Sequence, residues 1–438
     1  MKVCKFGGSS VASAEQIKKV KAILDKDEER SLLVVSAPGR RFADDEKITD
    51  LLYLASSLVE ENDAGHDVDQ VFDRIALRYR DIAEELGIGE GAIDDALEEV
   101  LSNIKNGRDS AYAASRGEYL SARLIAKYLG WEFLDTEGVI IIGDDNKVED
   151  ITYTQLREKL HKGRKYVIPG FYGTSLSGEI TTFTRGGSDI TGAIVACAAD
   201  ADMYENWTDV SGVYSSDPRK VKSAHVIREL SYREVREFSE VGASVLHEEA
   251  IAPCITKGIP INIRNTNSPD DDGTIIGRTS SHAGVVGVSG KGGLTALYCH
   301  RLLLFKESDI AHRILSLLHI YGIKPSHTMY VCDSISWYFD TKTADKVDTD
   351  AMCARIKEEF KLDELLLEKG YAVVGLVGSN IENGMEYVDA LSVLRSHSIH
   401  PSSVSLGGSY TTFLIGVKEE RKDEAVSLIS DTLFGNGK

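Results

Sequence analysis

Short apolar segments alternate with longer amphipathic ones along this chain. Helical periodicity runs through residues 15–24 and 188–199. Apolar runs bounded by turn residues are typical of buried strands, and they lie at 3–6, 32–35, 166–169, 203–207 and 259–263. Strands that alternate with helices in this way favour an α/β fold, with a mostly parallel sheet between helical layers.

One long segment departs from the alternation. Residues 55–105 are acidic, rich in helix formers and almost free of strand patterns. We interpret them as a helical excursion from the first domain, which the pattern extends over residues 1–285, and not as a domain of their own.

The C-terminal part of the chain contains an internal repeat. The motif at 315–326 recurs at 391–402, an offset of 76 residues, with the same Leu-rich helix followed by Ile, Pro and Ser. An apolar strand precedes each copy and an alternating strand follows it. We predict a Gly-rich linker at 286–295 and two βαββαβ-like modules at 296–370 and 371–438. Completion of the first module by the C-terminal segment is the alternative.

Composition excludes several classes of partner. Lys and Arg number 50 against 69 Asp and Glu, a net charge of −19. Such a surface repels polyphosphates and anionic membranes, so we expect no nucleic-acid or membrane partner. No apolar run approaches the roughly 20 residues of a membrane span, no targeting segment is apparent, and the six cysteines lack zinc-ligand spacing. We expect a cytoplasmic protein.

The first candidate motif follows the first strand. Lys5 and Phe6 precede Gly7 and Gly8, and serines follow. Amides at a glycine turn and a helix N-terminus form a site for anions, and an ammonium at a strand end suits a transferred phosphoryl group. A plain turn with a helix cap is the simpler alternative.

A second glycine turn opens another apolar helix, at residues 181–189. Its Arg185 carries a guanidinium fork that suits a carboxylate. Ser188 and Asp189 stand where helix caps stand, and Asp189 could also orient a cation near phosphate. Capping alone explains Asp189 but not Arg185.

The third motif, residues 207–219, follows the strand at 203–207. It therefore lies at the carboxyl edge of the predicted sheet, where open α/β folds bind ligands. Thr208 and Asp209 could bond a base or a ribose, Tyr214 could stack, and Arg219 could meet phosphates, although Asp-Pro is also ordinary turn chemistry.

In this order and spacing, the three motifs resemble those of the aspartate kinases, amino acid kinase-fold enzymes whose regulatory half consists of two ACT modules. The resemblance covers essentially the whole chain, with no room for a fused dehydrogenase. It implies Lys5 and Asp189 as catalytic residues. It implies substrate contacts at Ser36, Thr49, Glu118, Arg185 and Ser188. It implies nucleotide contacts at Lys5, Phe6, Gly7, Gly8, Thr208, Asp209, Tyr214, Ser215, Ser216, Asp217, Pro218 and Arg219.

Two departures from the family pattern stand out. The family's Gly-Ala-Lys run reads Gly-Ala-Ser here, so Ser244 replaces a lysine that helps hold ATP. The loop between Ser36 and Thr49 is also longer than usual, and its Arg40 or Arg41 is a candidate replacement for the missing cation, with solvated loop arginines as the alternative.

The resemblance implies ATP- and Mg²⁺-dependent phosphorylation of the side-chain carboxylate of L-aspartate, with feedback by lysine, threonine or both. Effector contacts fall on Ser308, Ile310, Pro325 and Ser326, and ACT pairing implies a homodimer or a dimer of dimers. Two alternatives stay open at this point: a different amino acid kinase, and a non-catalytic amino acid sensor.

Overall fold

The fold was obtained as a computed structural model, which describes residues 1–60, 68–184, 186–243, 248–406, 408 and 410–435. The chain divides into two units. Unit 1 consists of Met1–Val213, Val226–Tyr232 and Leu246–Ser280, and unit 2 of Tyr214–His225, Arg233–Val245 and Ser281–Lys438. Among the described residues, no helix has the length and apolar character needed to cross a bilayer.

Unit 1 is built on a mostly parallel sheet. Within the described residues its strand order is β3-β5-β2-β1-β8-β10-β11-β9. Its one antiparallel pair in this set is β10 with β11, and β9 pairs in parallel with β11. The strands of unit 1 are β1 (Lys2–Phe6), β2 (Arg30–Val35), β3 (Glu132–Phe133), β4 (Ile141–Ile142), β5 (Tyr166–Pro169), β6 (Tyr172–Ser175), β7 (Ile180–Thr182), β8 (Met203–Thr208), β9 (Glu229–Ser231), β10 (Ile261–Asn265) and β11 (Thr274–Gly277). The chain passes from β1 to β2 and β5 on one side and later to β8 on the other, so the carboxyl ends of β1 and β8 flank a switch point of the kind that binds ligands.

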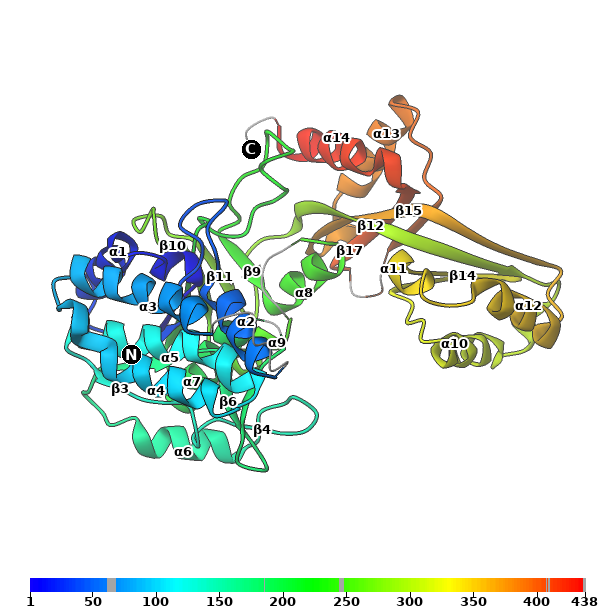
Figure 1. The fold of residues 1–438 in the computed structure, drawn as a ribbon. Coiled ribbons are helices and arrows are strands. Elements are labelled where there is room, and N and C mark those ends of the chain that lie inside the picture. The colour runs from blue at the N-terminus through cyan, green and yellow to red at the C-terminus, as the bar shows by residue number, and fades with distance from the viewer. Residues whose placement is uncertain (61–67, 185, 244–247, 407, 409, 436–438) are drawn as a thin grey trace. The chain divides into compact units, whose positions relative to one another are not determined.

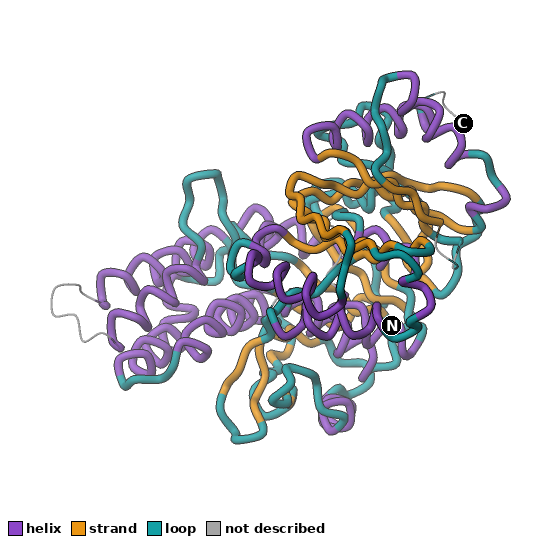
Figure 2. The backbone as a smooth tube through the Cα atoms, turned by 90° about the vertical axis from the view of Figure 1, so that its right-hand side faces the viewer, coloured by secondary structure: helices purple, strands orange, loops and turns teal. Residues whose placement is uncertain are grey.

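Helices cover both faces of this sheet, as the alternation predicted. The first two strands and their neighbours bury one face against α1–α5, and α6, α7 and α9 pack on the other. The helices α2–α5 form one bundle (Figures 1 and 2), and the segment predicted as a helical excursion lies in it. The helices of unit 1 are α1 (Ala14–Asp25), α2 (Ile48–Glu60), α3 (Val68–Glu85), α4 (Asp94–Lys105), α5 (Ser110–Leu129), α6 (Ile151–Lys159), α7 (Gly187–Ala198) and α9 (Glu248–Lys257). Apart from its first residue, α8 (Tyr232–Glu240) belongs to unit 2.

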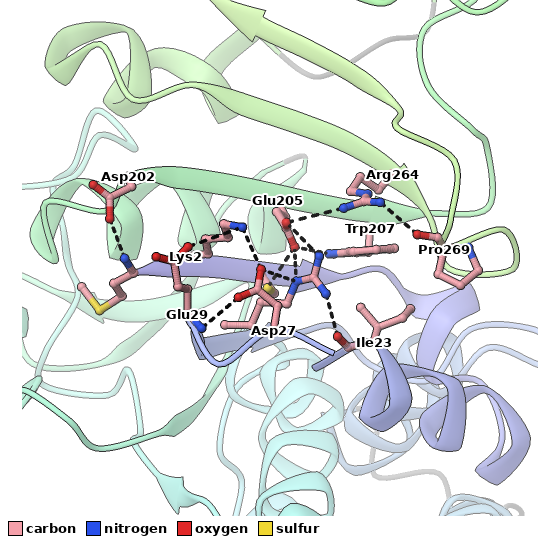
Figure 3. A network of polar contacts seen from close by, with 12 residues as sticks. Lys2, Ile23, Asp27, Glu29, Asp202, Glu205, Trp207, Arg264 and Pro269 are labelled. Atoms are coloured by element: carbon pink, nitrogen blue, oxygen red, sulfur yellow. Dashed lines mark hydrogen bonds and ion pairs between the residues drawn. The ribbon is translucent and has the colours of Figure 1, made fainter. Parts of the chain in front are cut away.

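A closed network of charges is buried under the face of the sheet toward α1 (Figure 3). Glu205 of β8 accepts two hydrogen bonds from Arg30, at 2.8 and 3.1 Å, and one from the indole of Trp207 at 3.0 Å. The Cys4 thiol donates to the same carboxylate at 3.4 Å, and the Arg264 guanidinium lies 3.8 Å away. The surrounding charges and donors thus offset the cost of burying Glu205.

Unit 2 contains a single antiparallel sheet shared by both copies of the repeat. Its order in the described residues is β13-β14-β12-β15-β17-β16. Its elements are β12 (Gly284–His300), α10 (Ile310–Ile320), β13 (His327–Val331), β14 (Ser334–Asp340), α11 (Thr341–Ala344), α12 (Thr349–Phe360), β15 (Glu364–Ser379), α13 (Glu386–Ser396), β16 (Ser403–Leu406), β17 (Thr412–Lys418) and α14 (Lys422–Phe434). The helices α10 and α13 keep the 76-residue offset of the repeat at both ends.

The predicted linker at 286–295 is part of the long strand β12. The first half of β12 pairs with the second half of β15, and its second half pairs with the first half of β15. Glycines read as a linker because they weaken strand propensity, but here they let other elements approach: a Cβ at Gly287 would overlap the Phe238 ring. The first half of β12 therefore pairs with the strand of the second module. This segment, at the start of the C-terminal half, crosses between the modules, and the C-terminal segment does not.

Candidate active site

The loop after β1 brings an ammonium and glycine amides to the switch point. Lys5 is 8% exposed and lies at the carboxyl end of β1. The amide of Gly7 donates to the Trp207 carbonyl at 3.2 Å, and the amide of Gly39 donates to the Gly8 carbonyl at 2.9 Å. A Cβ on Gly8 would meet the Ala37 carbonyl at 3.0 Å, so glycine permits the loops after β1 and β2 to touch.

The helix that follows begins later than the motif suggests. A short 3-10 turn covers Gly8–Val11, and α1 starts at Ala14 with the Ser13 hydroxyl accepting from the Gln16 amide at 3.4 Å. Phe6 was predicted to contact nucleotide, but its ring is fully buried and stacked on Trp207 at 5.6 Å. Its carbonyl accepts the Ser36 amide at 3.2 Å, so the Phe6 backbone joins the end of β1 to the residue that follows β2.

Lys5 and Asp189, the two predicted catalytic residues, are in contact. Lys5 Nζ lies 2.5 Å from Asp189 Oδ1. Asp189 stands in the first turn of α7, which begins after Gly186 in the left-handed conformation at φ 60°. Ser188 is buried beside it, packed on Gly170. Arg185, the predicted clamp for a substrate carboxylate, lies outside the described residues.

Glu118 of α5 is a buried carboxylate with an unused oxygen. It is 6% exposed, and within the described residues its Oε2 has no hydrogen-bond partner. Burial raises its pKa to about 8, against the opposing effects of a hydrogen bond from the Ala37 backbone and the charge of Lys5. A Cβ on the preceding Gly117 would overlap the Ala37 side chain, so glycine lets α5 approach the loop after β2. A buried acid without a full set of donors is a candidate for binding a cation.

The loop between β2 and α2 is fastened by its own ion pairs. Asp45 is buried and accepts from Arg41 at 2.9 and 3.0 Å and from Arg78 of α3 at 2.7 and 2.8 Å. Both guanidinium groups hold the pKa of Asp45 well below its usual range. Arg40 contacts only the Ala43 carbonyl in the described set, at 3.4 Å. Arg41 is therefore engaged in fixing the loop that carries Ser36 and leads to Thr49. Ser244, the position of the missing lysine, lies outside the described residues.

The predicted nucleotide segment is divided between the units. Thr208 ends β8 in unit 1 and Asp209 follows it, and the Thr208 hydroxyl donates to Asp209 at 3.1 Å. The residues from Tyr214 through Pro218 to Arg219 belong to unit 2. There Ser215 bonds His225 at 3.2 Å, Ser216 bonds the Val288 carbonyl and Ser430, and Asp217 forms a bidentate pair with Arg219. The two serine hydroxyls thus have structural partners.

The predicted effector residues are divided between surface and core. Ser308 is exposed before α10, and Pro325 and Ser326 precede β13, with the Ser326 amide donating to the Tyr338 carbonyl at 2.8 Å. Ile310 is fully buried in the core of its module. Its side chain therefore packs in that core.

Two residues of β8 were missed by the sequence analysis. The Asn206 amide donates to Asp189 Oδ1 at 3.0 Å, and the Tyr204 hydroxyl donates to the Asp189 carbonyl at 3.1 Å. The available signal was a pair of polar residues, Glu205 and Asn206, inside an otherwise apolar strand, since buried polar groups demand partners. No group of three or more His, Cys, Asp or Glu side chains gathers as a metal site in the part of the chain that is described.

Comparison with known proteins agrees with this geometry. The profile of the amino acid kinase family matches residues 1–265. Aspartokinase 3 of Bacillus subtilis is 32% identical over 99% of both chains. The aspartate kinase structure of Clostridium acetobutylicum, at 39% identity, covers 99% of this chain and 100% of its own with a TM-score of 0.90. Escherichia coli aspartokinase III in complex with aspartate and ADP shares the fold at 24% identity, with 99% and 100% coverage and a TM-score of 0.77. This chain therefore belongs to the amino acid kinase family and, within it, to the aspartokinases.

Proposed function

We propose that this enzyme transfers the γ-phosphoryl group of ATP to the side-chain carboxylate of L-aspartate, giving 4-phospho-L-aspartate and ADP. The observation that supports this most is the Lys5–Asp189 pair at the carboxyl end of β1, together with Glu118, a buried acid that keeps an unpartnered oxygen. A substrate with both an ammonium and a carboxylate suits these groups.

The charged residues of unit 1 bind different parts of the two substrates. The aspartate carboxylate is already ionised and attacks phosphorus in line, so the site needs positioning and charge neutralisation and no general base. Lys5 faces the charge that develops on the phosphoryl oxygens, and the Gly7 and Gly8 amides line the turn beside it. Glu118 binds the substrate ammonium in its ionised form.

Further substrate contacts rest on the sequence motifs. Arg185 pairs with a substrate carboxylate through its guanidinium fork. Ser36, Thr49 and Ser188 offer hydroxyls at the loop after β2, the start of α2 and the start of α7. On the nucleotide side, Thr208, Asp209, Tyr214 and Arg219 contact the base, ribose and phosphates.

Mg²⁺ suits this donor set as an ion held mainly by ATP oxygens. Within the described residues, both contacts of the Asp189 carboxylate reach Oδ1. This leaves Oδ2 for a cation, and Mg²⁺ in kinases commonly takes one or two carboxylates together with phosphates. When bound, the ion would neutralise phosphate charge.

Unit 2 supplies regulation in this proposal. The paired modules on one sheet are the regulatory half, and lysine, threonine or both bind near Ser308, Pro325 and Ser326 to inhibit the kinase. The homodimer or dimer of dimers forms through these modules. Escherichia coli aspartokinase III in complex with lysine and aspartate has the same fold.

A coupled ADP-release assay across candidate acids tests the catalytic proposal. We expect turnover with L-aspartate, trapped by hydroxylamine as the hydroxamate of an acyl phosphate, and little with glutamate or acetylglutamate. Turnover with another acid in preference to aspartate would favour a different amino acid kinase, and no turnover with any acid would favour a non-catalytic sensor.

Titration of that activity with lysine and threonine tests regulation. We expect inhibition by at least one of them, and a reciprocal effect of aspartate on effector binding measured by calorimetry. Insensitivity to both amino acids would remove the regulatory assignment while leaving the kinase assignment intact.

A further inference from the structure

The amide of Asn206 lies next to the catalytic pair. Lys5 and Asn206 are register partners on the adjacent parallel strands β1 and β8, so their side chains leave the same face of the sheet. Both reach the same atom on α7: Lys5 Nζ lies 2.5 Å and Asn206 Nδ2 3.0 Å from Asp189 Oδ1. Asn206 is 3% exposed, so this contact is made away from bulk water.

We propose that Asn206 is a positioning residue for phosphoryl transfer, which fixes the Asp189 carboxylate so that Lys5 keeps its remaining N–H groups for the phosphoryl oxygens. This inference rests on the proposed function. Asn206 itself touches neither substrate in the proposal; it acts through Asp189.

The hydrogen-bond donors and acceptors of the three side chains explain why an asparagine suits this position. An ammonium has three N–H donors, and a carboxylate has two oxygens that could both turn toward it. A second donor on Oδ1 holds the carboxylate plane, so the ion pair uses one oxygen and one N–H. Because the acceptor is a carboxylate, the side-chain amide must present its NH₂ group to it.

A second contact from the same strand fixes the backbone under Asp189. Tyr204, two residues before Asn206 and on the same face, donates to the Asp189 carbonyl at 3.1 Å. Its ring occupies the space beside Gly192, where a Cβ would overlap it. The strand thus fastens the first turn of α7 at two points, its backbone through Tyr204 and its functional group through Asn206.

The test replaces Asn206 in the full-length chain and separates kcat from KM. Asn206→Leu removes the donor at similar volume. We expect kcat per folded molecule to fall on the order of 10- to 100-fold, as misplacement of a catalytic group does, with KM for aspartate and ATP within about threefold of wild type. The matched control is Asn262→Leu: Asn262 is a buried residue of β10 and the register partner of Glu205, so it lies on the opposite face.

Asn206→Asp gives a readout that a purely structural role would not move. The new carboxyl faces Asp189 and Lys5, so at neutral pH two acids compete for one ammonium, whereas after protonation the new carboxyl can donate as the amide did. We expect the ratio of its kcat to that of wild type to rise as pH falls from 8 to 6, while the ratio for Asn206→Leu stays flat.

Three results would overturn the inference: kcat of Asn206→Leu within threefold of wild type, an equal loss in Asn262→Leu, or parallel pH profiles for the two Asn206 variants. Should Asn206→Leu fail to fold by circular dichroism, the profile of the isosteric Asn206→Asp decides alone. A wild-type enzyme without aspartate-dependent ADP release would instead overturn the proposed function itself.

Discussion

The two faces of β8 handle buried charge in opposite ways. Toward α1, Glu205 is saturated by Arg30, Trp207 and Cys4 and is closed to ligands. Toward α7, Asn206 supports a carboxylate whose ion pair with Lys5 uses one oxygen. Beside the loop after β2, the acid Glu118 of α5 keeps an oxygen without a partner in the described structure. The comparison teaches that the satisfied network stabilises the fold, while incomplete satisfaction coincides with the substrate site proposed above.

Breaking the saturated face should give the largest effect, and it should fall on stability. Glu205→Leu leaves Arg30 buried without its partner, so the free energy of unfolding should drop by about 3–5 kcal/mol. Urea denaturation measures this, with Glu205→Gln as the control that keeps acceptor and shape. A loss below about 1 kcal/mol, or a kcat per folded molecule far below wild type, would contradict the division between the two faces.

On the open face, Lys5→Met should affect catalysis and hardly affect folding. Removing a cation aimed at developing charge costs on the order of 10²- to 10³-fold in kcat. The control, Lys2→Met, sits at the other end of β1 and loses a surface-facing ion pair with Asp27 at 2.7 Å, so its kcat should match wild type. Steady-state kinetics with thermal melts would decide, and equal loss in both variants would show that β1 as a whole had been disturbed.

Glu118→Gln should sharpen the contrast, because it should weaken the binding of aspartate and increase the stability of the folded state. A hydrogen bond to a charged group contributes about 1.5–3 kcal/mol. Losing this partner for the substrate ammonium should therefore lower kcat/KM for aspartate roughly 10- to 100-fold. The unfolded carboxyl titrates near 4.5 and the folded one near 8, so the folded state holds an extra proton and loses stability as pH rises through that window. The variant lacks this loss.

The melting temperature of Glu118→Gln should therefore exceed that of wild type by a few degrees at pH 8.5, with the two converging toward pH 5. Glu99→Gln, at an exposed site on α4, is the control and should change neither property. A variant less stable than wild type at pH 8.5 would show that the acid is structurally required.

The last prediction concerns the pH dependence of the unmodified enzyme. Because Glu118 must be ionised to bind an ammonium, kcat/KM for aspartate should rise by up to about tenfold per unit from pH 6 and level near its pKa of about 8. kcat at saturating aspartate should change far less, since bound substrate keeps the acid ionised. A profile that is flat from pH 6 to 8 would mean that Glu118 is ionised in the free enzyme.

Local patterns predicted the elements well and the long-range contacts poorly. The segment at 166–169 coincides with β5, and Lys5 and Asp189, which come from two separate motifs, are in contact. The pairing of β1 with β8 joins residues about two hundred positions apart, and no local periodicity encodes which strand becomes a neighbour. Asn206 was therefore invisible as the register partner of Lys5. Composition likewise could not reveal that the glycines of β12 serve close packing.

The antiparallel pairing of β12 with β15 has a practical consequence for the design of fragments of this chain. A fragment that starts at residue 296 omits the strand segment that covers the second half of β15, and one that starts at 281 still omits Tyr214–His225 and Arg233–Val245, which belong to the same unit. Unit 2 is therefore not a cassette that can be excised or exchanged at a single junction. A chimaera that keeps it whole has to transplant three separate stretches of sequence.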